Sequence, residues 1–413
     1  MNRRERVMAI LNHQPADKIP VDCGSMHSSG IGAVPYNALK KALHIEGGET
    51  KVYDIIQQLA IPEEWYLERF QVDVIDLARV FANEANDWQD WVLPDGSPAK
   101  IPTWLKIEQK GKEWICLNND GEEIGLMPEG SFYFDQTIWP LYGKHPENFD
   151  NLESLFDRIL WTHCTDPLSK NIKNPKFFNQ LSQTAQKVYE ETDYAITLNY
   201  GSLYFELSQW VYRNDELLMR LISDTKMINR MLDKLTEIHL ARLEPLLEAV
   251  GPYAQVIIFG DDLGTQNNSF ISPTMYRDIF FPRHKEIFEF VKKKTNMRTF
   301  LHSCGAISNL IPDLIEASLD ILNPVQINAK GMEPEKLKRE FGKDMVFWGG
   351  GVDTQHTLAN ATPDEVRKQV RKNSEIFMQD GGFVFAQVHN ILAGVPTDNI
   401  LAMYDEVNTI RYK

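Results

Sequence analysis

Residues 254–262 read AQVIIFGDD, and residues 298–305 read RTFLHSCG. Each stretch is a short apolar run, rich in β-branched and aromatic residues, that ends in glycine or polar residues. Three further apolar runs follow at 319–324, 345–348 and 382–388, and helix-like segments separate all five. Short buried strands that alternate with helices indicate parallel β–α–β units.

The N-terminal half supplies three more candidate strands, at Ile19–Asp22, Val72–Leu77 and Tyr194–Asn199. Together the two halves supply the eight strands of a (β/α)8 barrel. A doubly wound open sheet is the rival fold, but no Gly-x-Gly-x-x-Gly pattern follows the first strand. The sequence therefore predicts one α/β domain, a (β/α)8 TIM barrel, over residues 1–413.

Residues 83–145 interrupt the alternation after the second strand. Turn sequences occur at 94–96 (Pro-Asp-Gly) and 119–121 (Asn-Asp-Gly), between short β-prone runs such as 112–117. The segment also holds five tryptophans, which are Trp88, Trp91, Trp104, Trp114 and Trp139. We expect a β-hairpin insertion on the side of the barrel where active sites are found.

Composition excludes several classes of protein. The chain has 43 Lys and Arg residues against 58 Asp and Glu residues, a net charge of −15. This balance argues against a general nucleic-acid binder or a protein of anionic membrane surfaces. The four cysteines have no disulfide-framework spacing, and the N-terminus lacks a signal-peptide pattern. We expect a soluble cytoplasmic enzyme with reduced thiols.

Polar residues follow directly after the predicted strands. The set consists of Asp261, Asp262, His302, Cys304, Gln326, Asp353 and His389. In a barrel, the C-terminal ends of the strands converge on one mouth, where catalytic groups lie. Any one of these residues could belong to an ordinary polar loop, but the whole set favours an active site.

His302 and Cys304 are the most informative pair. Two residues at i and i+2 on an extended segment project to the same side. Imidazole and thiolate both suit Zn²⁺, so we predict His302 and Cys304 as ligands and His389 as the third, with Asp353 and Asp262 in reserve. Alternatively, His302 makes only hydrogen bonds and Cys304 is a small buried apolar residue.

The other polar residues have less specific roles. We predict Asp261, Asp262 and Asp353 as catalytic residues, since a carboxylate can act as a base, a ligand or a group that orients a histidine. Such acids equally often cap loop amides.

Substrate contacts are expected at Gln326, Tyr204 and Glu206. Gln326 could hydrogen-bond a substrate, although loop polarity alone could explain it. The aromatic residues around Glu206 could instead belong to the core.

Motifs along nearly the whole chain resemble those of the uroporphyrinogen decarboxylase superfamily. They are Arg3–Val7 with Pro15–Pro20, Gly260–Asp262 with Pro273–Pro282, His302–Gly305, Gly350–Asp353 and Val395–Ile400. The resemblance implies a (β/α)8 barrel, in agreement with the strand count.

Two branches of that superfamily have different chemistry. Its decarboxylases use no metal and hold their substrate with arginines after the first strand, whereas residues 22–30 contain no arginine here. Its cobamide-dependent methyltransferases hold zinc with a His-x-Cys pair, matched by His302 and Cys304, and a later cysteine. His389 stands where that later cysteine would be.

The resemblance therefore implies a zinc-dependent methyltransferase. It would move a methyl group between a small donor, such as a methoxylated aromatic compound, and a corrinoid carried by a partner protein. One alternative is metal-free decarboxylation of a tetrapyrrole or another acid, with Asp73 or Asp76 as the catalytic aspartate. Another is a corrinoid- or tetrapyrrole-binding protein without catalytic activity.

Overall fold

A computed structural model describes residues 1–77, 85–165 and 174–412. Seven strands form one parallel sheet in the order β16-β15-β14-β13-β12-β11-β4. They are β4 (Val74–Asp76), β11 (Ala195–Ser202), β12 (Val256–Gly260), β13 (Arg298–His302), β14 (Ile321–Asn323), β15 (Val346–Trp348) and β16 (Phe383–Val384). Each overlaps a strand expected from the sequence.

The segment Pro20–Asp22 closes the sheet into a barrel. Val21 forms a parallel bridge with Phe385, whose backbone N–H donates to the carbonyl of Pro20 over 2.9 Å. On the other side, the backbone N–H of Asp73 donates to the carbonyl of Val21 over 2.8 Å. This segment therefore occupies the eighth strand position, between β16 and β4. The predicted (β/α)8 barrel is confirmed.

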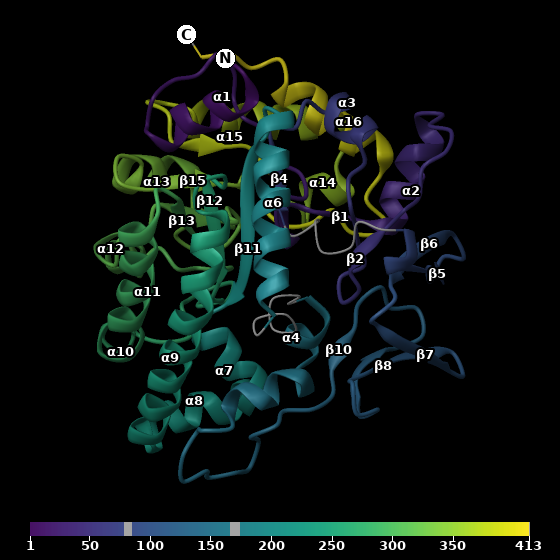
Figure 1. Ribbon diagram of the computed structural model, residues 1–413. Helices are drawn as coiled ribbons and strands as arrows, with labels where there is room; N and C mark the ends of the chain where they lie inside the picture. Colours follow the sequence, from purple (N-terminus) through teal and green to yellow (C-terminus); the bar gives the residue numbers. More distant parts are fainter. Residues whose placement is uncertain (78–84, 166–173, 413) are drawn as a thin grey trace.

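Apolar side chains fill the interior of the barrel and one helix closes its floor. Val256, Phe300 and Trp348 are fully buried members of the inner cluster. Helix α1 (Arg3–Leu11) adds Val7 and Ile10 to the same cluster, so it covers the N-terminal ends of the strands. Figure 1 shows α1 and both chain termini at this end. The floor is thus packed, and the opposite end carries the longer loops.

The longer helices that alternate with the strands lie around the outside of the barrel (Figure 1). They are α6 (Pro175–Glu191), α9 (Thr225–Val250), α11 (Phe281–Lys294), α12 (Ile311–Glu316), α13 (Pro334–Phe341), α15 (Pro363–Phe377) and α16 (Thr397–Val407). Two short helices also follow strands, α10 (Pro273–Met275) and α14 (Thr357–Asn360). A π-helical turn, Tyr276–Phe280, joins α10 to α11.

Two helices each begin with a capping residue followed by proline. The Ser272 hydroxyl accepts the backbone N–H of Met275 at the start of α10. Thr362 and Glu365 form a reciprocal capping box at the start of α15. Both caps satisfy backbone donors that have no partner inside the helix.

Antiparallel strands occupy much of the chain between β4 and β11. β5 (Trp88–Val92) pairs with β6 (Pro98–Pro102), and a second sheet has the order β10-β9-β8-β7. Its strands are β7 (Lys106–Lys110), β8 (Glu113–Leu117), β9 (Glu123–Met127) and β10 (Asp135–Gln136). Short helices, η3 (Ala85–Asp87), η4 (Leu152–Arg158) and α4 (Leu160–Thr165), flank these strands.

Smaller elements follow the first and third barrel strands. After the first come η1 (His27–Ser29), α2 (Ala33–Ala42), α3 (Glu64–Arg69) and a small sheet of β1 (Ile31–Gly32), β2 (Val52–Asp54) and β3 (Leu59–Ala60). After β11 come α7 (Phe205–Tyr212) and α8 (Asn214–Ser223). Among the described residues, no helix has the length and apolar character needed to cross a bilayer.

Candidate functional site

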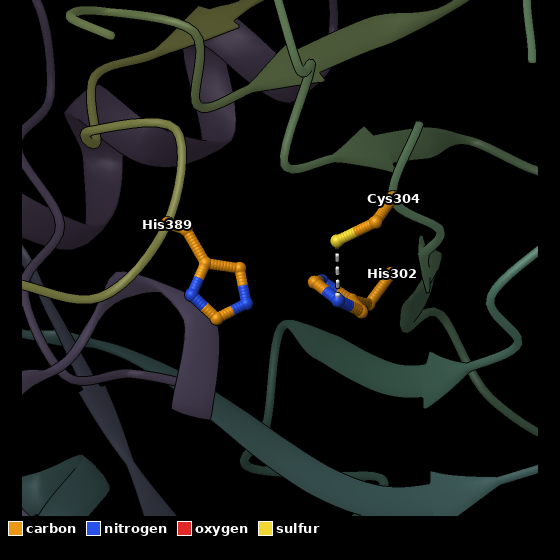
Figure 2. A group of neighbouring side chains, drawn as sticks. All are labelled: His302, Cys304 and His389. Carbon is orange, nitrogen blue, oxygen red and sulfur yellow. Dashed lines mark hydrogen bonds between the residues drawn. The ribbon is translucent and has the colours of Figure 1, made fainter. Parts of the chain in front are cut away.

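Three side chains from distant parts of the sequence meet at the mouth of the barrel. His302 ends β13, Cys304 follows it, and His389 follows β16. One ligand atom from each lies within 4.8 Å of the other two, and His302 Nε2 is 3.4 Å from Cys304 Sγ. Figure 2 shows the three side chains facing one another. Two imidazoles and a thiol are a donor set that suits Zn²⁺ and leaves a fourth tetrahedral position open.

Asn323, the last residue of β14, orients the ring of His302. Its side-chain N–H₂ donates to the main-chain carbonyl of Trp348 over 2.8 Å. The amide oxygen therefore faces His302, and His302 Nδ1–H donates to it over 2.7 Å. Nε2 of His302 is left without the hydrogen, with its lone pair available to a metal.

His389 is presented in the same way by its neighbour Asn390, whose amide oxygen lies 3.0 Å from His389 Nδ1. Burial lowers the pKa of His389, and the nearby His302 lowers it further. The imidazole is therefore neutral at neutral pH, which is the state that ligates a metal.

The backbone after β13 places Cys304. Its N–H donates to the carboxylate of Asp262 over 2.7 Å. Gly305 then turns the chain with a φ of +90°, and a Cβ there would lie 2.5 Å from the backbone of Gly264. Glycine is thus required at this turn on both conformational and steric grounds.

The thiol of Cys304 lies in negative surroundings. Burial raises its pKa well above the usual value, and the carboxylate of Asp262 raises it further. A bound cation would reverse this balance, because it stabilises the thiolate.

A cavity of about 190 Å³ opens beside the three ligand candidates. His302, His389, Asp262 and Glu206 line one part of it. Another part is aromatic and includes Trp161, Trp210 and Tyr133. The rings of Trp161 on α4 and Trp210 on α7 stack with centroids 5.6 Å apart and an interplanar angle of 7°. The cavity wall therefore has an aromatic part, which includes two stacked indole rings, and a polar part.

Glu206 is an acid on the cavity wall whose carboxyl group accepts a hydrogen bond from the hydroxyl of Ser202. Burial raises its pKa well above the usual value, and the charges of Asp262 and Asp261 raise it further. Glu206 can therefore hold a proton at a pH where an exposed glutamate cannot.

The two adjacent aspartates predicted as catalytic have different positions. Asp262 lines the cavity, with a carboxylate oxygen 3.6 Å from His302 Nε2. Asp261 is fully buried and is not among the cavity-lining residues. One of its oxygens accepts the backbone N–H of Glu206 over 2.7 Å, and the other lies 2.9 Å from Nε2 of His284. Asp261 thus anchors the start of α7.

Tyr204, Gln326 and Asp353 are also absent from the cavity wall. Tyr204 is fully buried, with its hydroxyl 3.0 Å from that of Thr236. Gln326 accepts the backbone N–H of Gly305 over 2.8 Å, and so supports the turn that follows Cys304. Asp353 accepts the backbone N–H of Gln355 over 2.8 Å, a local loop contact.

The aspartates of the decarboxylase alternative lie at opposite ends of β4. Asp73 precedes the strand, at the floor of the barrel, where it pairs with Arg6 and accepts the backbone N–H of Val21 over 2.8 Å. Asp76 ends the strand and is buried, but it is not among the cavity-lining residues. Neither residue thus contributes a carboxylate to the cavity wall.

Several contributors to the site were not predicted from the sequence. Asn323 and Asn390 orient the two histidines, and His27, Trp161 and Tyr133 line the cavity. Asn323 and Asn390 each stand at a predicted strand end, so the rule that found His302 and His389 could also have found them. No local pattern marks the aromatic residues, because they come from segments outside the β–α alternation.

Comparison with known proteins agrees with this fold. Residues 211–410 match the family model described as uroporphyrinogen decarboxylase (URO-D), which confirms the predicted resemblance for that part of the chain. No curated protein sequence matches significantly.

Several solved structures are similar to this chain over part or nearly all of its length. A methyltransferase from Methanosarcina mazei is 17% identical, with 99% of each chain covered and a TM-score of 0.59. A D-psicose 3-epimerase from Clostridium cellulolyticum H10 is 10% identical over 56% of this chain and 80% of its own, with a TM-score of 0.32. The homocysteine methyltransferase MmuM from Escherichia coli is 11% identical over 64% and 77%, with a TM-score of 0.26.

Proposed function

Because residues 211–410 match the uroporphyrinogen decarboxylase family, we propose that this chain is a zinc-dependent methyltransferase of the cobamide-dependent branch of that superfamily. It moves a methyl group between a small donor and a corrinoid held by a partner protein. The structural similarity over 99% of a methyltransferase chain supports methyl transfer within this superfamily.

The observation that carries the proposal is the convergence of His302, Cys304 and His389 beside a cavity. Both histidines have Nδ1 occupied by an amide oxygen, which leaves Nε2 of each ring available to a metal. A bound Zn²⁺ would supply a Lewis acid that activates the donor oxygen or the acceptor sulfur. The residues present fit that ion in type and number, and the two histidines also in protonation state, whereas the Cys304 thiol would lose its proton on metal binding.

The cavity walls indicate the class of methyl donor. A methoxylated aromatic ring can pack against the aromatic side chains of the cavity wall, which include Trp161 and Trp210. Glu206, which holds a proton because of its burial and its acidic neighbours, can transfer that proton to the phenolate oxygen as the methyl group leaves. The aromatic surface orients the donor, and Glu206 neutralises the leaving group.

The first test is the metal content of protein purified without chelators or nickel resin. We expect about one zinc per chain in the wild type, and loss of the metal in Cys304→Ala and His389→Ala, since two protein ligands hold Zn²⁺ far more weakly than three. His27→Ala is the matched control, because His27 lines the same cavity outside the ligand set. Absence of zinc from the wild type would refute the metal mechanism.

Turnover is tested with cob(I)alamin, or with a corrinoid protein, and a panel of methoxylated aromatic compounds and methylated amines. Methylation converts the cob(I)alamin absorption spectrum to that of methylcobalamin. We expect this conversion with wild-type protein and none with Cys304→Ala. A zinc-loaded protein that gives no spectral change with any donor would contradict the methyl-transfer proposal while leaving the metal site intact.

A further inference from the structure

We propose that Asp54, Gln57 and Asn390 form a hydrogen-bond relay that sets which nitrogen of His389 carries the hydrogen. The inference rests on the proposed function in that His389 acts there as a metal ligand. The relay joins β2 and the turn after it to the loop after β16, and Gln57 and Asn390 are 333 positions apart in the chain.

Asp54, at the end of the relay away from His389, determines the orientation of the Gln57 side-chain amide. Its Oδ1 accepts the backbone N–H groups of Ile56 and Gln57, over 2.9 and 3.2 Å. Its Oδ2 accepts the side-chain N–H₂ of Gln57 over 2.9 Å. A carboxylate can only accept hydrogen bonds, so the amide nitrogen of Gln57 has to face Asp54 and its amide oxygen has to face away.

The orientation of the Gln57 amide determines that of the Asn390 amide, which in turn determines where the imidazole of His389 carries its hydrogen. Gln57 Oε1 accepts the side-chain N–H₂ of Asn390 over 2.7 Å. Asn390 therefore turns its amide oxygen to His389, whose Nδ1 lies 3.0 Å away. Nδ1 must carry the hydrogen in order to donate to that oxygen. Nε2 keeps its lone pair, on the side where His302 and Cys304 lie (Figure 2).

Burial makes the relay rigid. The exposed fractions of Asp54, Gln57 and Asn390 are 0%, 6% and 1%. Water cannot readily replace any of the partners, so reversing one amide would leave two donors or two acceptors face to face in a buried site. The tautomer of His389 is thus determined by a carboxylate that does not contact the histidine. These are positioning residues, because none of them is in the ligand set.

His302 provides an internal comparison. Its partner Asn323 donates to a main-chain carbonyl, which no side-chain substitution can reverse. The relay behind His389 ends in a side chain, and its polarity can therefore be inverted by mutation.

Asp54→Asn is the decisive variant. The backbone N–H groups of Ile56 and Gln57 hold the new amide oxygen in place, so the new N–H₂ faces Gln57. Gln57 and Asn390 then reverse, and an N–H₂ group faces His389 Nδ1, which forces the hydrogen onto Nε2. We expect Zn²⁺ binding to weaken by about 10–100-fold, the usual effect of losing a partner of a metal-binding histidine.

The double variant Asp54→Asn/Asn390→Asp should restore binding. The carboxylate introduced by Asn390→Asp accepts hydrogen bonds from both Gln57 and His389 Nδ1–H, so the hydrogen returns to Nδ1. Rescue by a second change in a different segment is not expected of a merely structural defect. Asp73→Asn is the control for loss of a buried carboxylate, because Asp73 lies at the barrel floor; it should leave Zn²⁺ affinity unchanged.

Two readouts separate the inference from the proposed function. Zn²⁺ affinity is measured by competition with a chromophoric chelator, and the His389 tautomer by ¹⁵N NMR of metal-free, ¹⁵N-histidine-labelled protein, assigned with His389→Gln. We expect hydrogen on Nδ1 in the wild type and the double variant, and on Nε2 in Asp54→Asn. Hydrogen on Nε2 in the wild type, or an unchanged tautomer in Asp54→Asn, would overturn the relay whether or not zinc binds.

Discussion

The two ends of the barrel use their polar residues in different ways. At the floor, the guanidinium of Arg6 bridges two carboxylates, with Asp17 at 2.7 and 2.8 Å and Asp73 on the other side. At the mouth, His302 and His389 each have one ring nitrogen held by the protein, while the other faces Cys304. The three charged groups at the floor therefore pair with one another. At the mouth, the atoms that could bind a metal face one another.

This difference distinguishes residues that maintain the fold from residues that can bind a ligand. A buried charge that is fully paired has no capacity left for a ligand, and removal of its partner destabilises the folded state. Donor atoms that converge without a strong mutual interaction are suited to hold something else. Residue type alone does not distinguish the two cases, since aspartates occur at both ends. We expect mutations at the floor to change folding, and mutations at the mouth to change binding.

The largest effect on stability is expected from Arg6→Leu. It leaves the buried carboxylate of Asp73 without its partner, and breaking a buried pair on one side typically costs about 3–5 kcal/mol of unfolding free energy. Urea denaturation measures the change. Arg339→Leu is the control, because its pair with Glu340 is exposed and should contribute under about 1 kcal/mol. Metal content should stay at the wild-type level; its loss from folded Arg6→Leu protein would show that the two ends are coupled.

His239 is another histidine of the cavity wall, and it can be compared with His302 and His389. It lines the cavity, yet its Nδ1 lies 2.9 Å from the hydroxyl of Tyr200 and its Nε2 lies 3.2 Å from the carbonyl of Leu203, so neither nitrogen is left for a metal. Burial lowers the pKa of His239 to about 3. The unfolded chain binds a proton near pH 6.5 and the folded protein does not, so the stability from this histidine is complete above that pH and is lost as the pH falls.

The expected loss is roughly 3 kcal/mol between about pH 6.5 and about pH 4, at about 1.4 kcal/mol per pH unit. Unfolding free energies of the wild type and His239→Gln, measured at several pH values in that range, isolate this contribution from that of the carboxylates. The variant should have the shallower pH dependence. Equal slopes for the two proteins would mean that His239 is protonated in the folded state.

A smaller effect is expected from Trp161→Leu, which removes half of the stacked aromatic surface. Loss of such stacking should weaken binding of an aromatic methyl donor by about 10-fold, or roughly 1.4 kcal/mol. Isothermal titration with the best donor measures the change, and zinc content serves as the internal reference. Trp65→Leu is the control, because Trp65 does not line the cavity. Equal binding by both variants would locate the donor elsewhere.

Much of the architecture was predictable because its signals are local. Apolar runs of strand length predicted the barrel strands. The convergence of His302, Cys304 and His389 followed from the same pattern, since parallel strands bring their C-terminal ends to one mouth. In this way a rule about strands identified residues of one site that lie far apart in the chain.

Only the tertiary structure decided how the polar residues were used. Asp261 and Asp262 are neighbours in sequence, but adjacent residues of an extended segment point in opposite directions, so one anchors α7 and the other lines the cavity. The control of His389 by Asp54 and Gln57 depends on a contact across most of the chain. The direction of each hydrogen bond in the relay depends on the neighbour that packs against it. A sequence pattern records which residues are present but not which atoms will face one another.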